Sequence, residues 1–171
     1  MPQAMPIATP KPLARSLPPG PSRLRALRVI HPFPTLLNVA AVAGLAFVAA
    51  GGAPDAWLLA RMMLFMLLAQ SAIGIVNDIC DRDLDAAAKP WKPIPSGAIS
   101  LRTAKIGAVT AIAGATALAA TSGAAGFTLA MLGMACGLAY DVRLKRSPLS
   151  ALPFMVAIPV LPLWVWATLD A

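Results

Sequence analysis

The chain has 171 residues, of which 58% are hydrophobic and only 12% are charged, and its mean hydropathy is +0.74. This composition excludes an ordinary soluble domain, in which about a quarter of the residues are charged. The net charge of +7 does not indicate nucleic-acid binding, because the basic residues flank apolar runs and form no stripe on a soluble face. We therefore expect an all-α integral membrane helical bundle.

The first 28 residues are expected to form a disordered cytoplasmic tail, because they are rich in proline and lack apolar periodicity. Three arginines at its end, Arg23, Arg25 and Arg28, favour contact with an anionic membrane leaflet. Residues 29–171 are expected to form one transmembrane domain. His31 precedes Pro32, and we interpret it as a residue at the start of the first span and not as a ligand.

Five apolar stretches predict about five transmembrane helices, because backbone groups in lipid must find their partners within a helix. The stretches are Thr35–Ala50, Trp57–Val76, Lys105–Thr121, Phe127–Tyr140 and Leu149–Leu169. Some are shorter than the ~20 residues that cross a bilayer, so the helices are expected to extend into the flanking loops. Gly133 and Gly137 would let helix backbones approach closely, and Trp164 and Trp166 suit the outer interface.

The basic residues predict the topology, because cytoplasmic loops carry an excess of Lys and Arg. Thirteen of the 14 lie before the first span, between the second and third spans, or between the fourth and fifth. Arg61 alone falls on the other side. The amino terminus and both long loops are therefore predicted in the cytoplasm, with the active face on that side of the plasma membrane.

An acidic cluster ends the second span, where residues 77–85 read N-D-I-C-D-R-D-L-D. On a helix, Asp78, Asp81 and Asp85 fall within about 60° of one another, whereas Asp83 faces away. Clustered carboxylates repel each other unless a cation neutralises them, and Mg²⁺ prefers such oxygen ligands together with substrate phosphates. We interpret the cluster as a metal or diphosphate site, with the amide oxygen of Asn77 as a further ligand. The alternative is a solvated loop that only terminates the helix.

Two basic segments complete this picture. Lys89 and Lys92 lie in the proline-rich loop after the acidic cluster, which would otherwise be a stiff connector. The end of the fourth span carries a phenol, an acid and three cations, namely Tyr140, Asp141, Arg143, Lys145 and Arg146. Carboxylates for Mg²⁺ beside cations for phosphate oxygens predict a diphosphate site, and the membrane location predicts a lipidic substrate such as an allylic prenyl diphosphate. Gln70 either lines the substrate cavity or bonds between helices.

These segments resemble the UbiA-type intramembrane prenyltransferases. The resemblance lies in N-D-x-x-D-x-x-x-D at residues 77–85, P-S-G-x-I-S at residues 95–100 and the segment 140–146. It implies Mg²⁺-assisted loss of diphosphate and capture of the allylic cation by an aromatic or lipophilic acceptor. It also implies that Asn77, Asp78, Asp81 and Asp85 hold the metal, with the last three catalytic. Lys145 and Tyr140 would contact diphosphate. The family commonly spaces this Tyr and Lys four residues apart, whereas Tyr140 and Lys145 are five apart, so Arg143 or Arg146 could take the role of the Lys.

Family members have about nine helices and a second Asp-rich motif. We therefore expect this chain to be the amino-terminal part of such an enzyme, partnered by a carboxy-terminal half or by a second copy. The alternative is a non-catalytic membrane subunit, or an inactive fragment, that retains a cation-binding Asp motif. An ion-pathway protein is a third reading, which few polar residues along the spans support.

Overall fold

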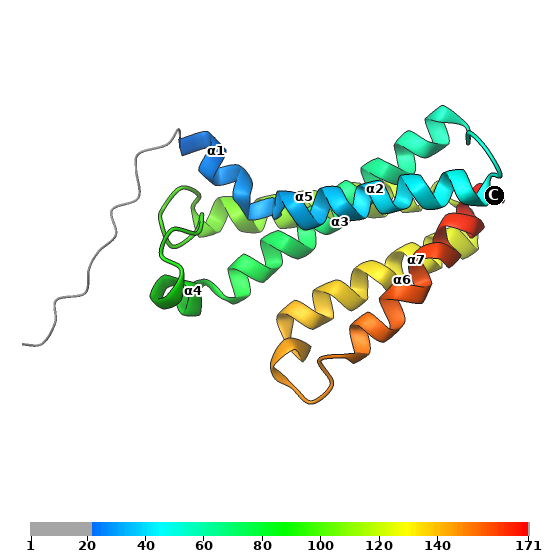
Figure 1. Ribbon diagram of the computed structural model, residues 1–171. Coiled ribbons are helices and arrows are strands. Elements are labelled where there is room, and N and C mark those ends of the chain that lie inside the picture. The colour runs from blue at the N-terminus through cyan, green and yellow to red at the C-terminus, as the bar shows by residue number, and fades with distance from the viewer. Residues whose placement is uncertain (1–21, 171) are drawn as a thin grey trace, which may run out of the picture.

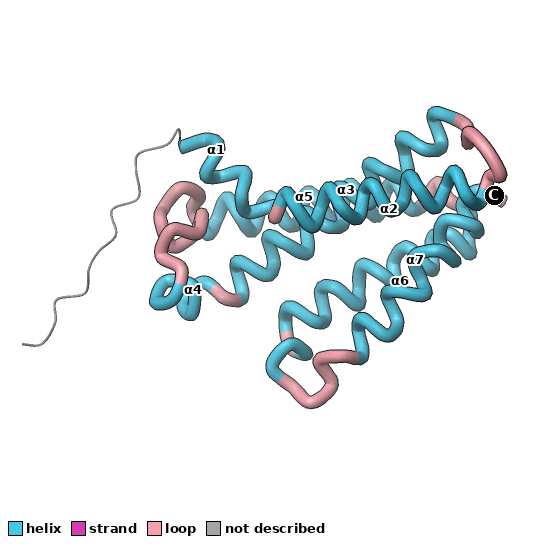
Figure 2. The backbone as a smooth tube through the Cα atoms, in the orientation of Figure 1, coloured by secondary structure: helices cyan, strands magenta, loops and turns pink. Residues whose placement is uncertain are grey.

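The computed structural model describes residues 22–170, and every regular element in that part of the chain is helical (Figures 1 and 2). The short helices are α1 (Ser22–Ala26), the 3-10 helices η1 (Leu27–Ile30) and η2 (Leu144–Arg146), and α4 (Arg82–Ala88). The long helices are α2 (Pro32–Ala49), α3 (Ala56–Cys80), α5 (Leu101–Ala119), α6 (Gly123–Val142) and α7 (Leu152–Leu169). The tail predicted over residues 1–28 lies outside the described residues up to residue 21, and its remainder is helical.

The five long helices confirm that the five predicted apolar stretches are helical, and four of the helices extend past a predicted end, as expected. Helix α3 has 25 residues, which gives a length of ~37 Å and is enough to cross ~30 Å of hydrocarbon. Helices α2, α3, α6 and α7 have the length and composition of membrane spans. Helix α5 is similar in length but less apolar, because Arg102 and Lys105 lie in its first turns.

Helix α3 is central and packs against α2, α5 and α6, while α7 packs against α6 and α2. Helix α5 contributes an alanine face, whose buried residues are Ala104, Ala108, Ala111, Ala115 and Ala119. Residues spaced three or four apart share one side of a helix, and small side chains let two helices approach closely. Gly137 of α6 allows the same with α3, because a Cβ at this position would overlap the Ile73 side chain.

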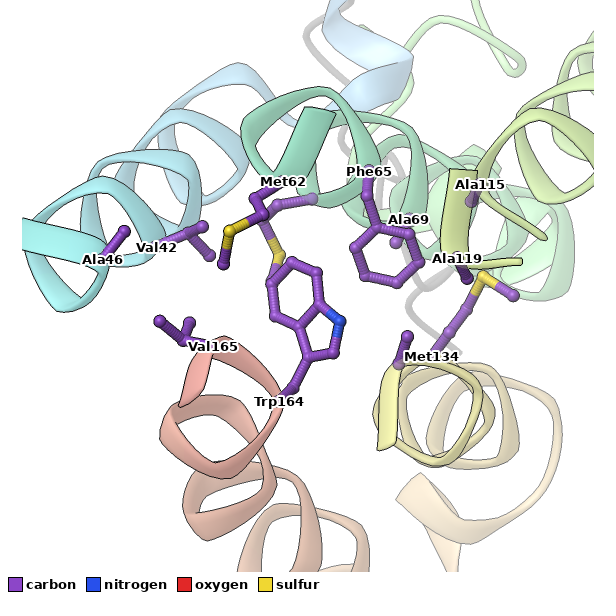
Figure 3. Close-up of a cluster of buried hydrophobic side chains, with 12 residues drawn as sticks. Val42, Ala46, Met62, Phe65, Ala69, Ala115, Ala119, Met134, Trp164 and Val165 are labelled. Carbon is purple, nitrogen blue, oxygen red and sulfur yellow. The ribbon is translucent and has the colours of Figure 1, made fainter. Parts of the chain in front are cut away.

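All five long helices contribute to the apolar core, in which the rings of Phe65 and Trp164 pack at a tilt with centroids 4.8 Å apart (Figure 3). Trp164 is only 2% exposed, so the prediction that it lies at the membrane interface is wrong. Its ring is buried beside Phe65, and its indole Nε1 has no hydrogen-bond partner among the described residues. Trp166, on the other side of the helix, remains 40% exposed.

One end of the bundle gathers the polar connections. Helix α4, the loop 89–100 and the α6–α7 connection lie at this end, opposite the α2–α3 turn and the carboxy terminus (Figure 1). A second apolar cluster anchors the loop, because Ile94 and Ile99 pack against Val29 and Ile75. Gly97 supplies a turn with φ of +73° that other residues rarely adopt. The loop is thereby held beside the end of α3.

Candidate active site

The acidic motif spans a break between two helices. Helix α3 ends at Cys80, and Asp81 has φ of −95° and ψ of 3°, a sparsely populated backbone conformation. Backbone hydrogen bonds continue across the break, from Asp81 to the Asn77 carbonyl and from Asp85 to the Asp81 carbonyl. The predicted stripe on one continuous helix is therefore interrupted at its middle carboxylate, and the three aspartates divide into two clusters.

The first cluster, which we call the Lys92 cluster, contains Asp78, Asp85, Lys92 and His31. Lys92 donates to Asp78 Oδ1 at 2.8 Å and to Asp85 Oδ2 at 2.6 Å. Burial alone would lower the pKa of Lys92, but hydrogen bonds and charges from the two carboxylates outweigh burial and raise it. The ammonium thus bridges two carboxylates that would otherwise repel each other.

The second cluster, the Asp81 cluster, joins the α3–α4 break to the α6–α7 connection. Lys145 donates to Asp81 Oδ2 at 2.8 Å, and Arg146 donates to Asp81 Oδ1 at 2.9 Å. Burial alone would raise the pKa of Asp81, but Lys145 and Arg146 hold that pKa below its usual value. Both oxygens of this carboxylate therefore face cations from a distant part of the chain.

Asn77 and Asp141 extend the Asp81 cluster. The Asn77 amide donates to Asp141 Oδ1 at 2.7 Å, and Lys145 Nζ lies 3.8 Å from the same oxygen. Asp141 is only 3% exposed. Asn77 uses its amide N–H in this contact, so its amide oxygen remains available as a ligand atom for a metal ion.

The other predicted residues are placed less tightly. Lys89 Nζ lies 3.8 Å from Asp85 Oδ1 on a side chain that is 54% exposed. Tyr140 packs edge-on against Phe154, with ring centroids 4.8 Å apart. Arg143 is exposed and forms no ion pair with a described residue. Asp83 faces away, as predicted, with 88% of its side chain exposed.

An apolar cavity of about 650 Å³ opens between α2, α3, α6 and α7. His31, Asn77, Tyr140 and Asp141 line its polar end, whereas Phe65 and Trp164 line it deep in the core. Gln70 also lines this cavity, which favours a role toward a ligand over the alternative of a bond between helices. A smaller cavity of about 280 Å³ lies on the other side of His31, against Asp78, Trp91 and Lys92.

Comparison with known proteins places this arrangement in a family. The UbiA prenyltransferase family matches residues 37–171. The chain belongs to this family. Together with the four apolar helices, membership makes the chain a multi-pass membrane protein.

Two relatives of this UbiA chain illustrate the range of the family. A 4-hydroxybenzoate octaprenyltransferase from Paracidovorax citrulli is 37% identical over 84% of this chain and 52% of its own length. A digeranylgeranylglyceryl phosphate synthase from Natronomonas pharaonis is 32% identical over 65% of this chain and 41% of its own length. The chain thus spans about half the length of the curated relatives it matches, and no solved structure matches it.

The donor set of this UbiA chain fits a magnesium ion that is shared with a substrate. Within residues 22–170, no three His, Cys, Asp or Glu side chains form a complete metal site. Magnesium, however, is commonly held by one or two carboxylates plus substrate phosphates. Asp78 Oδ2 is buried without a hydrogen-bond partner among the described residues, so it offers a carboxylate oxygen for this purpose.

Sequence reasoning missed two residues of the UbiA site. Asp141 was noted only as an acid beside Tyr140, although it binds Asn77 directly. His31 was interpreted as a residue at the start of a span, but its Nε2 lies 2.9 Å from Asp78 Oδ1. The second contact joins positions 47 residues apart, and the only signal in the sequence was that His31 is the single histidine.

Proposed function

We propose that this chain transfers a prenyl group from an allylic prenyl diphosphate to an aromatic or lipophilic acceptor in the membrane, with Mg²⁺ assisting departure of the diphosphate. The observation that carries the proposal is one juxtaposition. His31, Asn77 and Asp141 line the polar end of an apolar cavity of about 650 Å³. The charged clusters adjoin this end, because Lys145 Nζ lies 3.8 Å from Asp141 Oδ1 and Asp78 Oδ1 lies 2.9 Å from His31 Nε2. A diphosphate head fits the charged end, and a prenyl tail fits the apolar interior.

The roles follow from the charges. Asp78 and Asp85 would hold the metal, with the Asn77 oxygen and Asp81 as further ligands. The metal would supply positive charge that stabilises the departing diphosphate. Lys92, Lys145 and Arg146 would bind phosphate oxygens, and the guanidinium can do so through two parallel hydrogen bonds. Lys89, Arg143 and Tyr140 stand at the margin of this site as further contacts to the diphosphate.

The reaction breaks the bond between the allylic carbon and the diphosphate oxygen, and the electron pair leaves with diphosphate. An acceptor atom then bonds to the allylic carbon and, in an aromatic acceptor, the ring carbon loses its proton. The apolar wall of the cavity would keep water from the allylic cation. Because the relatives are named for a hydroxybenzoate and for a glyceryl phosphate, aromatic and lipid acceptors both belong in a test panel.

The test is diphosphate release from a labelled allylic diphosphate by the purified chain in lipid, with Mg²⁺ or with EDTA. The acceptor panel contains aromatic acids and glyceryl phosphate lipids. Release that depends on both Mg²⁺ and an acceptor supports the proposal. Release that appears only after addition of a carboxy-terminal partner would assign the activity to an assembly of two chains. The proposed setting is the plasma membrane, with the charged end facing the cytoplasm.

A non-catalytic membrane subunit is the second candidate, and one observation favours it. Lys92, Lys145 and Arg146 already neutralise the three carboxylates of the motif, so the clusters can serve as structural ion pairs. This reading predicts no diphosphate release under any of the conditions above, with or without a partner.

A further inference from the structure

His31 occupies an unusual position between η1 and α2. Its φ of 49° and ψ of 66° place it in the left-handed region, and it is the sole residue other than glycine with positive φ in the described part of the chain. Histidine enters this region more often than most residues do, but the conformation is still uncommon and concentrates at functional sites. The backbone here turns the side chain toward α3.

The imidazole contacts one particular carboxylate oxygen. His31 Nε2 lies 2.9 Å from Asp78 Oδ1, and because a carboxylate only accepts, Nε2 carries the hydrogen. Lys92 donates to the same oxygen at 2.8 Å. Both donors therefore occupy Oδ1, while Oδ2 is buried and has no partner among the described residues. The carboxylate is fixed in an orientation that leaves one oxygen available.

The ring is also held by its surroundings. A Cβ at position 74 of α3 would lie 3.2 Å from His31 Cδ2 and 3.3 Å from the Ile30 carbonyl carbon, which is closer than ordinary packing. Gly74 therefore provides the space in which the imidazole lies. His31 lines both the large cavity and the small one.

We propose that His31 is a positioning residue, which holds Asp78 through Oδ1 so that Oδ2 is directed to a divalent cation bound with diphosphate. Outer partners that orient a metal ligand have this effect in many metal sites. The inference rests on the proposed function, since it requires the cation and diphosphate to bind at Asp78. It adds a residue outside the acidic and basic motifs, contributed by the segment before the first long helix.

The experiment measures Mn²⁺ affinity by electron paramagnetic resonance, with inorganic diphosphate present and the full chain in lipid nanodiscs. His31→Gly removes the imidazole but retains the left-handed backbone, which glycine adopts freely. We expect it to weaken Mn²⁺ binding ~10–100-fold, the usual effect of removing an outer partner of a metal ligand. His31→Gln returns a donor at similar reach and should recover most of the affinity.

Gly74→Ala is the second variant, because it leaves residue 31 intact and displaces the imidazole. We expect a smaller loss of Mn²⁺ affinity than in His31→Gly, with the melting temperature unchanged. If His31→Gly and Gly74→Ala both bind Mn²⁺ as tightly as wild type, the positioning role is wrong while the metal site stands. If the wild-type chain binds no Mn²⁺ with diphosphate, the metal site and the role of His31 both fail.

Discussion

The Lys92 cluster and the Asp81 cluster lie at the same end of the bundle but are assembled from different parts of the chain. Lys92 reaches Asp85 and Asp78 across 7 and 14 residues. Lys145 and Arg146 reach Asp81 across 64 and 65 residues. The first cluster therefore belongs mainly to one local unit of α3, α4 and the following loop, whereas the second exists only when α6 and its connection to α7 pack beside α3.

The two clusters also differ in exposure. In the Lys92 cluster the side chains of Asp78, Asp85 and Lys92 are 1%, 5% and 19% exposed. In the Asp81 cluster Arg146 is 64% exposed, although Lys145 is only 12% exposed. If a charge is removed from the Lys92 cluster, its buried partners have no solvent to stabilise their charges. In the Asp81 cluster, water can still reach the charges beside the exposed Arg146. The comparison predicts a rigid metal-holding part and a more adjustable phosphate-binding part.

The largest expected effect comes from Asp78→Asn in the Lys92 cluster. The change removes the charge of the proposed metal ligand with almost no change in shape. We expect diphosphate release to fall by more than ~100-fold, because loss of even an outer partner typically costs 10–100-fold. The measurement is the initial rate with a labelled allylic diphosphate in an active assembly.

The matched control is Asp83→Asn, which removes a carboxylate from the same motif. Asp83 is 88% exposed and contacts Arg82. Its rate should equal that of wild type. Equal losses of rate in Asp78→Asn and Asp83→Asn would show that the net charge of the motif determines the rate and that the position of each carboxylate does not. The clustered aspartates would then have no role that Asp83 lacks.

The spacing of the motif predicted part of the site because helical periodicity is local. Positions 78 and 85 are two turns apart, so their approach to one cation follows from the helix repeat. The backbone break at Asp81 was not predictable from periodicity. Both oxygens of Asp81 bind cations that lie 64 and 65 residues further along the chain, and helical periodicity carries no information about such distant partners.

Long-range contacts account for the remaining misses. The five helices were predictable from apolar runs, but their neighbours were not, so the burial of Trp164 against Phe65 was missed. Likewise, His31 meets Asp78 only after η1 and α2 fold against α3. The helices predicted from apolar runs were confirmed, whereas the break in the aspartate stripe and the contacts between distant helices needed the structure.

The second-largest expected effect is a difference in stability between variants of the two clusters. Lys92→Met leaves Asp78 and Asp85 close together in a buried setting. Breaking a buried pair typically costs ~3–5 kcal/mol, and we expect the lower end because Lys92 is 19% exposed. Lys145→Met should cost less, ~1.5–3 kcal/mol as for a hydrogen bond to a charged group, because Arg146 still neutralises Asp81 and Asn77 still donates to Asp141.

Thermal unfolding in detergent compares these two variants, and added Mn²⁺ should partly restore Lys92→Met by replacing the lost charge between the carboxylates. A larger loss in Lys145→Met than in Lys92→Met would reverse the assignment of the rigid and adjustable clusters.

Gly137→Ala tests whether the second cluster depends on helix packing. The added methyl group overlaps the Ile73 side chain, so either Ile73 or α6 itself must shift. Overpacking of this kind costs ~1–3 kcal/mol, and the contacts of Asp81 with Lys145 should weaken while those of Lys92 persist. The measurement is thermal stability, with Ile73→Val combined as a rescue.

Gly44→Ala is the control, because nothing lies within 4 Å of a Cβ at that position. It should be neutral or slightly stabilising, as alanine favours a helix by up to ~1 kcal/mol over glycine. If Gly44→Ala lowered the stability as much as Gly137→Ala, the close approach of α6 and α3 at Ile73 would not account for the loss.

The smallest effect is a pH dependence that differs between the clusters. The pKa of Asp81 is lowered from 3.8, so its ion pairs stabilise the fold fully above pH 3.8 and are lost as the pH falls through the lowered pKa. The pKa of Lys92 is raised from 10.5, so its pairs are complete below pH 10.5 and are lost as the pH rises through the raised pKa. Acid protonates the carboxylates of both clusters, so the clusters differ in strong alkali, where Lys92 loses its charge while Arg146 keeps its pair with Asp81.

Unfolding temperatures of wild type, Asp81→Asn and Lys92→Met across pH test this difference. The stability gap between wild type and Asp81→Asn should narrow only in acid, by less than ~1 kcal/mol because exposed pairs are screened. The gap to Lys92→Met should narrow in strong alkali and also in acid, because protonated Asp78 and Asp85 no longer form ion pairs with Lys92. If Asp81→Asn also lost its gap in strong alkali, the clusters would be coupled through Asn77, Asp141 and Lys145, and the site would titrate as a single network.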